Sequence, residues 1–389
     1  MYRLLTFPLN ISFTLAISLI MSMIPLSYFY KTPEISSSMY VIVIILFFLI
    51  ASLLIPSTPY YKKVNFDNDN SWKFFFWFSL IGFAIEFVLY GIPIFTPGGR
   101  DSYTGMPVIH VAFYSSAMVC VLMSSTYSSP KNAVICLAYA SILSVITMSR
   151  QMMMICFAIS LISFLSRNRL SAKKWFYILF FVSLVLFLFG VIGNIRQQLA
   201  GDYFDDYIIT IGGANELGVS VGQSVYWIWL YISSPMYNLI LNIENYYKFG
   251  DLCALNVYYG SCSGDYITSV IVPGIFNKYM SGNEFIDDLQ VAYLNVSTAF
   301  ASSSRILGLP GILIQCVLSI LFYFIGLVLT PIRYRESFKI YFSVLSLYMC
   351  FDNKFIRTEF FFGFVLIFLC KLINSIKIGV TKKHLNHNG

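Results

Sequence analysis

Residues 39–59, MYVIVIILFFLIASLLIPSTP, contain no charged side chain and are apolar almost throughout. A helix of about 20 such residues matches the thickness of the hydrocarbon core of a bilayer. Backbone amides in hydrocarbon must be hydrogen-bonded within the segment, which favours a helix over an extended chain. The segment therefore predicts a membrane-spanning helix. Ten such spans are predicted along the chain, at 8–30, 39–59, 73–95, 107–127, 133–149, 151–166, 175–193, 310–330, 340–352 and 357–375.

The composition of the 389 residues agrees with this fold class. Apolar residues make up 58% of the chain and charged residues 11%, and the mean hydropathy is +0.74. A soluble domain averages about 25% charged residues, so this chain lacks the polar surface of a cytosolic enzyme or a nucleic-acid-binding domain. We predict an all-α polytopic membrane protein with the lipid bilayer as its solvent and no nucleic-acid partner.

The distribution of basic residues predicts the orientation. Loops rich in Lys and Arg stay on the cytoplasmic side of a membrane. Both ends of the chain and every second connection between the predicted spans together carry 16 of the 25 Lys and Arg residues. Both termini, including the tail 376–389, are therefore predicted to be cytoplasmic, and the other connections to face outward.

One outward connection, 194–309, is much longer than the rest and divides the spans of 1–193 from those of 310–375. It contains 12 of the 28 tyrosines. A structureless connection of this length is unusual unless it is functional. Its apolar segment 219–241 is predicted to be an interfacial or re-entrant helix with Trp and Tyr side chains at headgroup depth.

Aromatic and acidic residues alternate in the long connection, as in GDYFDDY at 201–207. A tyrosine ring stacks on a sugar face while its hydroxyl binds a polar edge. This pattern predicts substrate binding, although an exposed loop has the same composition. The predicted substrate-binding residues of this connection are Tyr203, Tyr231, Tyr237, Asp205 and Asp206.

The cysteines and histidines show no metal-binding pattern. Six of the eight cysteines lie in predicted spans, as small buried apolar residues do. Cys253 and Cys262 lie in the long connection, where an oxidising compartment permits a disulfide, and their spacing leaves the paired and free states open. Zinc-type spacings and nucleotide-binding motifs are absent from the sequence. Chemistry without a metal or cofactor is the prediction.

Arginines gather at the predicted outward ends of the spans. A guanidinium keeps its charge and matches two phosphate oxygens, so such a group suits a lipid phosphate or diphosphate. The predicted catalytic residues are Arg150, Arg196, Arg305 and Arg357. Single arginines also snorkel from helix ends, which is the structural alternative. Arg150 lies between two short spans, where an unpaired arginine costs about 3 kcal/mol, so either a ligand phosphate or a protein carboxylate is its partner.

Two further titratable residues lie within predicted spans, in the halves that face outward. Glu86 is the only carboxylate that lies more than two residues from the end of a predicted span. An intramembrane acid indicates function by default, but neutralising one of the arginines is the interpretation that we favour. His110 is a candidate base, with a hydrogen-bonded core histidine as the favoured alternative. Both residues are retained as predicted substrate-binding residues.

Four short strings carry a resemblance to a known family. They are TMSRQ at 147–151, GNIRQQL at 193–199, YISSPMYNL at 231–239 and NVSTAFASSSRILGLPG at 295–311. Together with ten or more spans and one long outward connection before the last spans, they resemble the O-antigen polymerase family, the Wzy-type polymerases of oligosaccharide repeat units.

The resemblance implies a GT-C-like enzyme of the bacterial inner membrane, with its long connection in the periplasm. Such enzymes transfer a growing glycan from undecaprenyl diphosphate onto the non-reducing end of another repeat unit that is linked to undecaprenyl diphosphate. The implied partners are these lipid-linked oligosaccharides and a chain-length regulator, and the implied diphosphate ligands are Arg150, Arg196 and Arg305, with Arg357 less directly. An O-antigen ligase and a flippase of lipid-linked oligosaccharides are the alternatives. A histidine expected in the long connection of a ligase is absent from residues 194–309, and a flippase predicts pseudo-symmetric halves.

Overall fold

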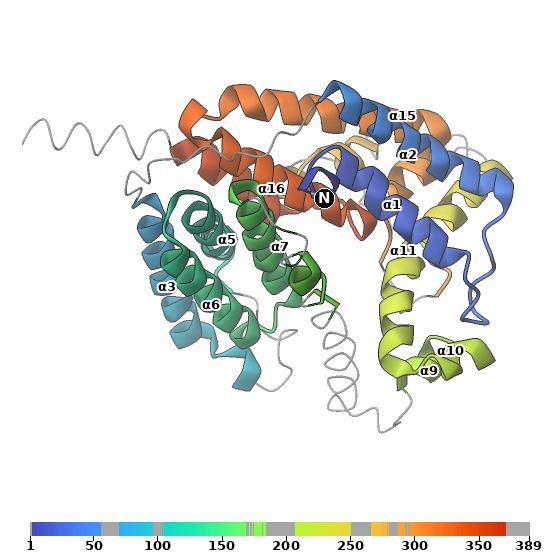
Figure 1. Cartoon of the computed structure of the whole chain (residues 1–389), viewed down its shortest axis with the longest axis horizontal. Helices are drawn as coiled ribbons and strands as arrows, with labels where there is room; N and C mark the ends of the chain where they lie inside the picture. Colours follow the sequence, from blue (N-terminus) through green and yellow to red (C-terminus); the bar gives the residue numbers. More distant parts are fainter. Residues whose placement is uncertain are drawn as a thin grey trace, which may run out of the picture.

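The computed structural model describes residues 2–55, 70–95, 103, 105–168, 171, 173, 175–180, 182–183, 207–249, 266–277, 279, 287–291, 294 and 296–370. Helices dominate this part of the chain (Figure 1). Five of them are long and apolar enough to span a membrane: α2 (Ile35–Leu54), α3 (Ser71–Tyr90, continued to Phe95), α5 (Ile109–Tyr127), α7 (Arg150–Arg167) and α15 (Ala301–Leu329). The shorter apolar helices are α1 (Leu9–Ser22), α6 (Pro130–Ile146) and Thr358–Cys370. An all-α membrane protein is thereby confirmed, while the number of ten spans stays a prediction.

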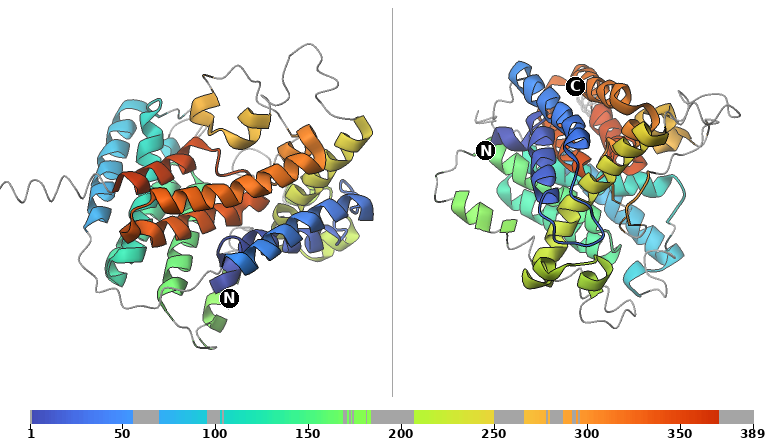
Figure 2. Two further views of the ribbon diagram at one scale, coloured as in Figure 1. Left: turned by 90° about the horizontal axis from the view of Figure 1, so that it is seen from above. Right: turned by 90° about the vertical axis from the view of Figure 1, so that its right-hand side faces the viewer.

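The helices pack in two groups that are joined by α16 (Arg335–Leu347). One group contains α3, α5, α6 and α7, and the other contains α1, α2, α15 and the long helix α11 (Gln223–Phe249). α16 contacts α5 and α7 on one side and α1 and α15 on the other (Figure 1). The second group brings α11, from the long connection, alongside α15 (Figure 2).

The exposed surfaces of the helices are apolar, as a bilayer requires. Leu53 on α2, Val88 on α3 and Val328 on α15 are each more than two-thirds exposed, with many other large apolar side chains around them. Water would disfavour so large an apolar surface, whereas lipid chains cover it without loss. α5 is the exception, because it is buried continuously from Phe113 to Tyr127 within its group.

Two predicted spans have different bounds in the structure. The first apolar run, 8–30, is helical only as far as Ser22, and the chain then turns at Pro25, whose ring cannot continue a helix. The span predicted at 310–330 starts earlier, at Ala301, so that the last nine residues of the predicted connection are helical. Gly308 interrupts α15 with a φ of 60° and a ψ of −142°, a conformation that favours glycine.

The segment 219–241 lies largely within α11, which packs against α1 and α15. Trp227 and Trp229 are each only 4% exposed. The Trp229 indole nitrogen donates a hydrogen bond to the Met21 carbonyl over 2.9 Å. These side chains are therefore covered by protein and differ from the headgroup-facing belt that was expected, because residues 21–30 fold back onto them.

Candidate functional site

A polar cavity of about 450 Å³ lies where the end of the long connection meets the turn before the last described helix. Its described lining residues carry three carboxylates and one guanidinium, together with hydroxyl and amide groups. The carboxylates are Asp287, Asp352 and Glu359, and the guanidinium is that of Arg357. We call this space the polar cavity.

Three asparagines on one face of α11 hold one wall of the polar cavity. The Asn242 side chain accepts a hydrogen bond from the Asp288 amide over 3.1 Å and donates to the Asp288 carbonyl over 2.8 Å. Asn238 accepts from the Gln290 amide over 3.0 Å and donates to the carbonyl of Val296 over 2.8 Å. Because residues four apart in a helix share a face, one side of α11 holds the backbone of Asp288, Gln290 and Val296.

A turn between α16 and the helix Thr358–Cys370 forms the opposite wall. The Asn353 side chain donates to the Val270 carbonyl over 2.9 Å, and the Gly274 amide donates to the Ile356 carbonyl over 2.7 Å. These bonds tie the turn to residues 270–274 of the long connection. Segments more than 70 residues apart in sequence therefore enclose one space.

Asp352 is the ionised carboxylate of the polar cavity. Its Oδ2 lies 3.0 Å from Nζ of Lys354 and 2.9 Å from Nε of Arg357. Burial acts to raise the pKa of Asp352, but the two cations outweigh it and hold the pKa below its usual range. Lys354 is itself only 8% exposed, so this pair sits in the wall.

Asp287 has a different environment in the same cavity. Its Oδ1 accepts a hydrogen bond from the Ser302 hydroxyl over 2.6 Å. Burial is the main cause that raises the pKa of Asp287, to about 6, with the hydroxyls of Ser302 and Ser297 acting in the opposite direction. Asp287 is thus a carboxylate whose charge changes near neutral pH.

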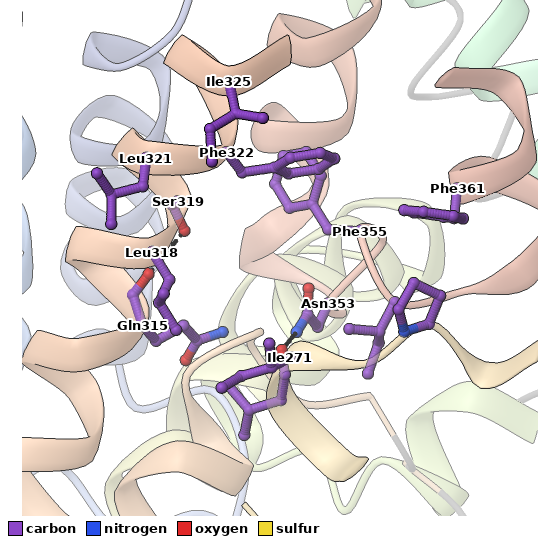
Figure 3. Close-up of a pocket in the computed structure, with 13 residues that line it drawn as sticks. Ile271, Gln315, Leu318, Ser319, Leu321, Phe322, Ile325, Asn353, Phe355 and Phe361 are labelled. Atoms are coloured by element: carbon purple, nitrogen blue, oxygen red, sulfur yellow. Dashed lines mark hydrogen bonds between the residues drawn. The ribbon is translucent and has the colours of Figure 1, made fainter. Parts of the chain in front are cut away.

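An apolar groove of about 290 Å³ adjoins the polar cavity. The side chains of Leu318, Phe322 and Ile325 project into it from α15, and Phe355 and Phe361 close the other side (Figure 3). Asn353 and Ile356 line both spaces. Two adjacent spaces therefore offer polar groups in one and aliphatic and aromatic side chains in the other.

Glu86 lies in a separate buried cluster at the end of α3. Its Oε2 lies 2.8 Å from Nδ1 of His110 and 2.8 Å from the Tyr103 hydroxyl, and its Oε1 accepts from the Met106 amide over 2.9 Å. In the described part of the chain its side-chain partners are His110 and Tyr103, so the expectation that Glu86 neutralises an arginine does not hold there. The carboxylate orients His110, in agreement with a hydrogen-bonded histidine.

The Glu86 cluster is connected to the polar cavity through α5. One turn after His110, the Tyr114 hydroxyl is 2.9 Å from that of Ser149, the residue before Arg150. The next residue, Ser115, donates to the backbone carbonyl of Glu359 in the cavity wall. His110 therefore lies on a helix that contacts the cavity wall, and the residue before Arg150 is bonded to that helix, although neither His110 nor Arg150 lines the cavity.

The described arginines among the predicted catalytic residues have different surroundings. Arg357 pairs with Asp352 and its side chain is 52% exposed. Arg305 pairs through Nε with Asp288 over 2.9 Å. Arg150, at the start of α7, is part-buried and does not line the polar cavity. Arg196 lies outside the described residues.

Arg305 differs from the other arginines in its hydrogen bonding. The residue is 7% exposed, and its Nη1 is buried without a hydrogen-bond acceptor among the described residues. A buried donor of a charged group that lacks an acceptor is unfavourable by about 1–3 kcal/mol. An anionic oxygen of a ligand would satisfy it, and Ser302, one turn earlier on α15, lines the polar cavity.

Tyr237 is a core residue in the structure. It is 1% exposed, stacks on Tyr30 with ring centroids 4.4 Å apart, and donates its hydroxyl to the Ser22 carbonyl over 2.6 Å. This burial does not fit the predicted sugar contact. Tyr231 is part-buried beside Trp227. Tyr203, Asp205, Asp206, Cys253 and Cys262 lie outside the described residues.

Replacing Tyr237 with phenylalanine should lower the free energy of unfolding by about 1 kcal/mol, because the Ser22 carbonyl loses its buried donor. Denaturant unfolding of the purified protein in detergent measures this change. Tyr279→Phe is the control, since Tyr279 is 87% exposed. Equal stability of the two variants would contradict the core role.

The sequence pattern alone did not single out Asp287, Asp352 or the three asparagines. Asp287 stands among several acids of the long connection, and the asparagines lie in an apolar helix. Spacing of Asn238, Asn242 and Asn245 at helical intervals was the one available signal. It indicates a polar stripe, but not what the stripe binds.

No family model matches the chain, and no curated protein or solved structure matches it.

Proposed function

We propose that this protein is a membrane glycosyltransferase that polymerises lipid-linked oligosaccharide repeat units at the outer face of a bacterial inner membrane. It would transfer a growing glycan from undecaprenyl diphosphate onto the non-reducing end of a second lipid-linked repeat unit. The observation that carries the proposal is the polar cavity joined to an apolar groove through Asn353 and Ile356. A sugar headgroup suits the first space and an isoprenoid chain the second.

The polar and charged groups in and near the polar cavity are suited to bind different parts of the substrate. Hydroxyl, amide and carboxylate groups are suited to bind sugar hydroxyls. Arg305, with its buried and unsatisfied Nη1, is the arginine best suited to donate hydrogen bonds to a diphosphate oxygen. A diphosphate is a good leaving group, so fixed cations can stabilise its developing charge without a proton donor. In the described residues the His, Cys, Asp and Glu side chains do not form a group that could hold a metal ion.

A gene deletion tests the proposed function directly. Cells that lack the protein should attach a single repeat unit to their lipid A core and should lose the long-chain ladder on a gel. Loss of the single repeat as well would support a flippase instead, and long polymer retained on the carrier lipid would support a ligase. An unchanged ladder would contradict all three functions.

A larger side chain in the apolar groove should prevent the isoprenoid chain from binding there. Leu318→Trp places a large ring in the groove and is expected to shorten or abolish the ladder with normal protein abundance. Val317→Trp is the matched control, because Val317 is the neighbouring residue of α15, is 47% exposed and does not line the groove. The result is read from gels and immunoblots of both strains. Equal ladders in the two strains would mean that the isoprenoid chain does not bind in the apolar groove.

A further inference from the structure

Two carboxylates of the polar cavity differ in the charge of their hydrogen-bond partners. Asp352 has Lys354 and Arg357 within 3.0 Å, whereas the described contact of Asp287 is the neutral hydroxyl of Ser302. A carboxylate that is paired with two cations is a weak proton acceptor. Two titratable groups whose surroundings separate their proton affinities in one site indicate an assignment of acid–base roles.

The position of Asp287 is fixed from two elements. The next residue, Asp288, is held through its backbone by Asn242 and through its carboxylate by Arg305 and Asn245, over distances of 2.8 to 3.1 Å. The Asp287 carboxylate is held by Ser302 at the start of α15. A base needs such support, because proton transfer requires hydrogen-bond reach to a fixed hydroxyl.

We propose, on the basis of the proposed function, that Asp287 is the general base of glycan transfer. In this step the acceptor sugar hydroxyl loses its proton to the Asp287 carboxylate while its oxygen bonds to the anomeric carbon of the donor. The bond between that carbon and the diphosphate oxygen breaks, and the electron pair leaves with undecaprenyl diphosphate. The proton on Asp287 then passes to water, which restores the carboxylate.

The charged groups around Asp287 set the pH range of this role. Asp288 and Asp352 act to raise its pKa, in the same direction as burial, and Ser302 and Ser297 act to lower it. Glu359 and Arg357 line the same cavity, and Lys354 and Arg305 are engaged by Asp352 and Asp288. With a pKa of about 6, Asp287 is ionised at pH 7.5 and protonated below pH 5, so the rate should fall as the pH is lowered through 6.

His110 is the alternative base, and the structure favours Asp287 over it. His110 is oriented by Glu86 but does not line the polar cavity. Glu359 lines the cavity, but among the acids that the structure describes there Asp287 is the one that combines this position with a hydroxyl partner and an adjoining residue held by α11.

The experiment uses the full-length protein in liposomes and lipid-linked repeat units that are extracted from the deletion strain. Asp287→Asn should lower the initial rate of elongation about 10²-fold to 10⁴-fold and remove the loss of rate near pH 6. Asp287→Glu should retain a measurable rate with a similar acid limb. Ser302→Ala should move the acid limb to higher pH, because Asp287 loses a hydrogen bond that favours its charged form. Glu216→Gln, which removes an exposed acid of the same connection outside the cavity, should match the wild type.

The unfolding temperature at pH 7.5 separates loss of chemistry from loss of fold. The fold disfavours the charge of Asp287, so the folded state binds a proton more tightly than the unfolded state, and stability falls as pH rises through 6. Asp287→Asn should therefore unfold at the same or a higher temperature. A folded Asp287→Asn protein with a rate within threefold of the wild type, or with an unchanged acid limb, would overturn the assignment of the base and leave the polymerase proposal intact. A deletion strain with a normal ladder would overturn the polymerase proposal instead.

Discussion

Replacement of Glu86 with alanine is expected to lower the free energy of unfolding by about 3 kcal/mol or more. Three donors converge on this fully buried carboxylate: the ring of His110, the hydroxyl of Tyr103 and the amide of Met106. Each donor left without an acceptor in a buried site costs about 1–3 kcal/mol. The loss includes a backbone amide, which cannot turn away to find another partner.

The same replacement should also reduce the proposed glycan polymerisation, because the cluster contacts the start of α5. Gly105 approaches the His110 ring so closely that a Cβ there would lie 2.8 Å from Nδ1. A shift of His110 would therefore move the preceding loop and the start of α5, from which Ser115 contacts the cavity wall at Glu359.

Chemical unfolding in detergent and the cellular ladder measure the two effects of Glu86→Ala. Glu86→Gln should show an intermediate loss of stability, since the amide keeps one acceptor oxygen but presents its own donors to the cluster. Glu34→Ala is the control, because Glu34 is exposed and precedes the first turn of α2. A Glu86→Ala protein within 1 kcal/mol of the Glu34→Ala protein would contradict the structural role of the cluster.

Replacement of Gly308 with alanine should destabilise the protein by about 3 kcal/mol and remove the ladder. The φ of 60° at this break in α15 is strained for any residue with a side chain, by about 1–3 kcal/mol. A Cβ would also lie 2.4 Å from the ring of Tyr246 on α11, and overpacking of this kind costs about 1–3 kcal/mol. The preceding turn carries Ser302 and Arg305, so movement of the break displaces both from the site.

Two further variants separate strain from crowding at Gly308. Gly222→Ala carries the same kind of strain, with a φ of 82°, but its Cβ would meet nothing within 4 Å. It should therefore lose less stability than Gly308→Ala and keep the ladder. The double variant Gly308→Ala with Tyr246→Ala should recover the part of the loss that is due to crowding. Identical losses of stability for Gly222→Ala and Gly308→Ala in denaturant unfolding would contradict this prediction. They would show that crowding of Tyr246 by the new Cβ does not contribute to the loss.

Much of the helical architecture was predictable from the sequence, and the departures have local causes. The apolar run at 39–59 overlaps α2 over residues 39–54, because a helix in hydrocarbon satisfies its backbone with its own residues. The early end of α1 follows from Pro25, which the apolar count of 8–30 overlooked. The early start of α15 at Ala301 was missed because Ser302, Ser303, Ser304 and Arg305 are polar residues that bind partners within the protein.

The candidate site was predictable only in part. Arginines and acids near the helix ends were expected to matter, and Arg305, Arg357, Glu86 and His110 do take part in defined polar contacts. Their division into separate pairs was not predictable, because each pairing depends on which segments pack together. The stripe of Asn238, Asn242 and Asn245 shows this well, since it binds backbone groups and the Asp288 carboxylate of a segment that lies 43 to 58 residues further along the chain.

Sequence alone was therefore sufficient to establish an all-α membrane protein. That information is local, because hydrophobicity over about 20 residues and the backbone bonding of one helix need no distant partner. Three-dimensional packing was needed to bring Asp287, Ser302 and Asp352 to one cavity and to leave Tyr237 in the core. A proton affinity or a buried contact arises from neighbours that are far apart in the chain, so it exists only after α11, α15 and the turn before Thr358 have packed together.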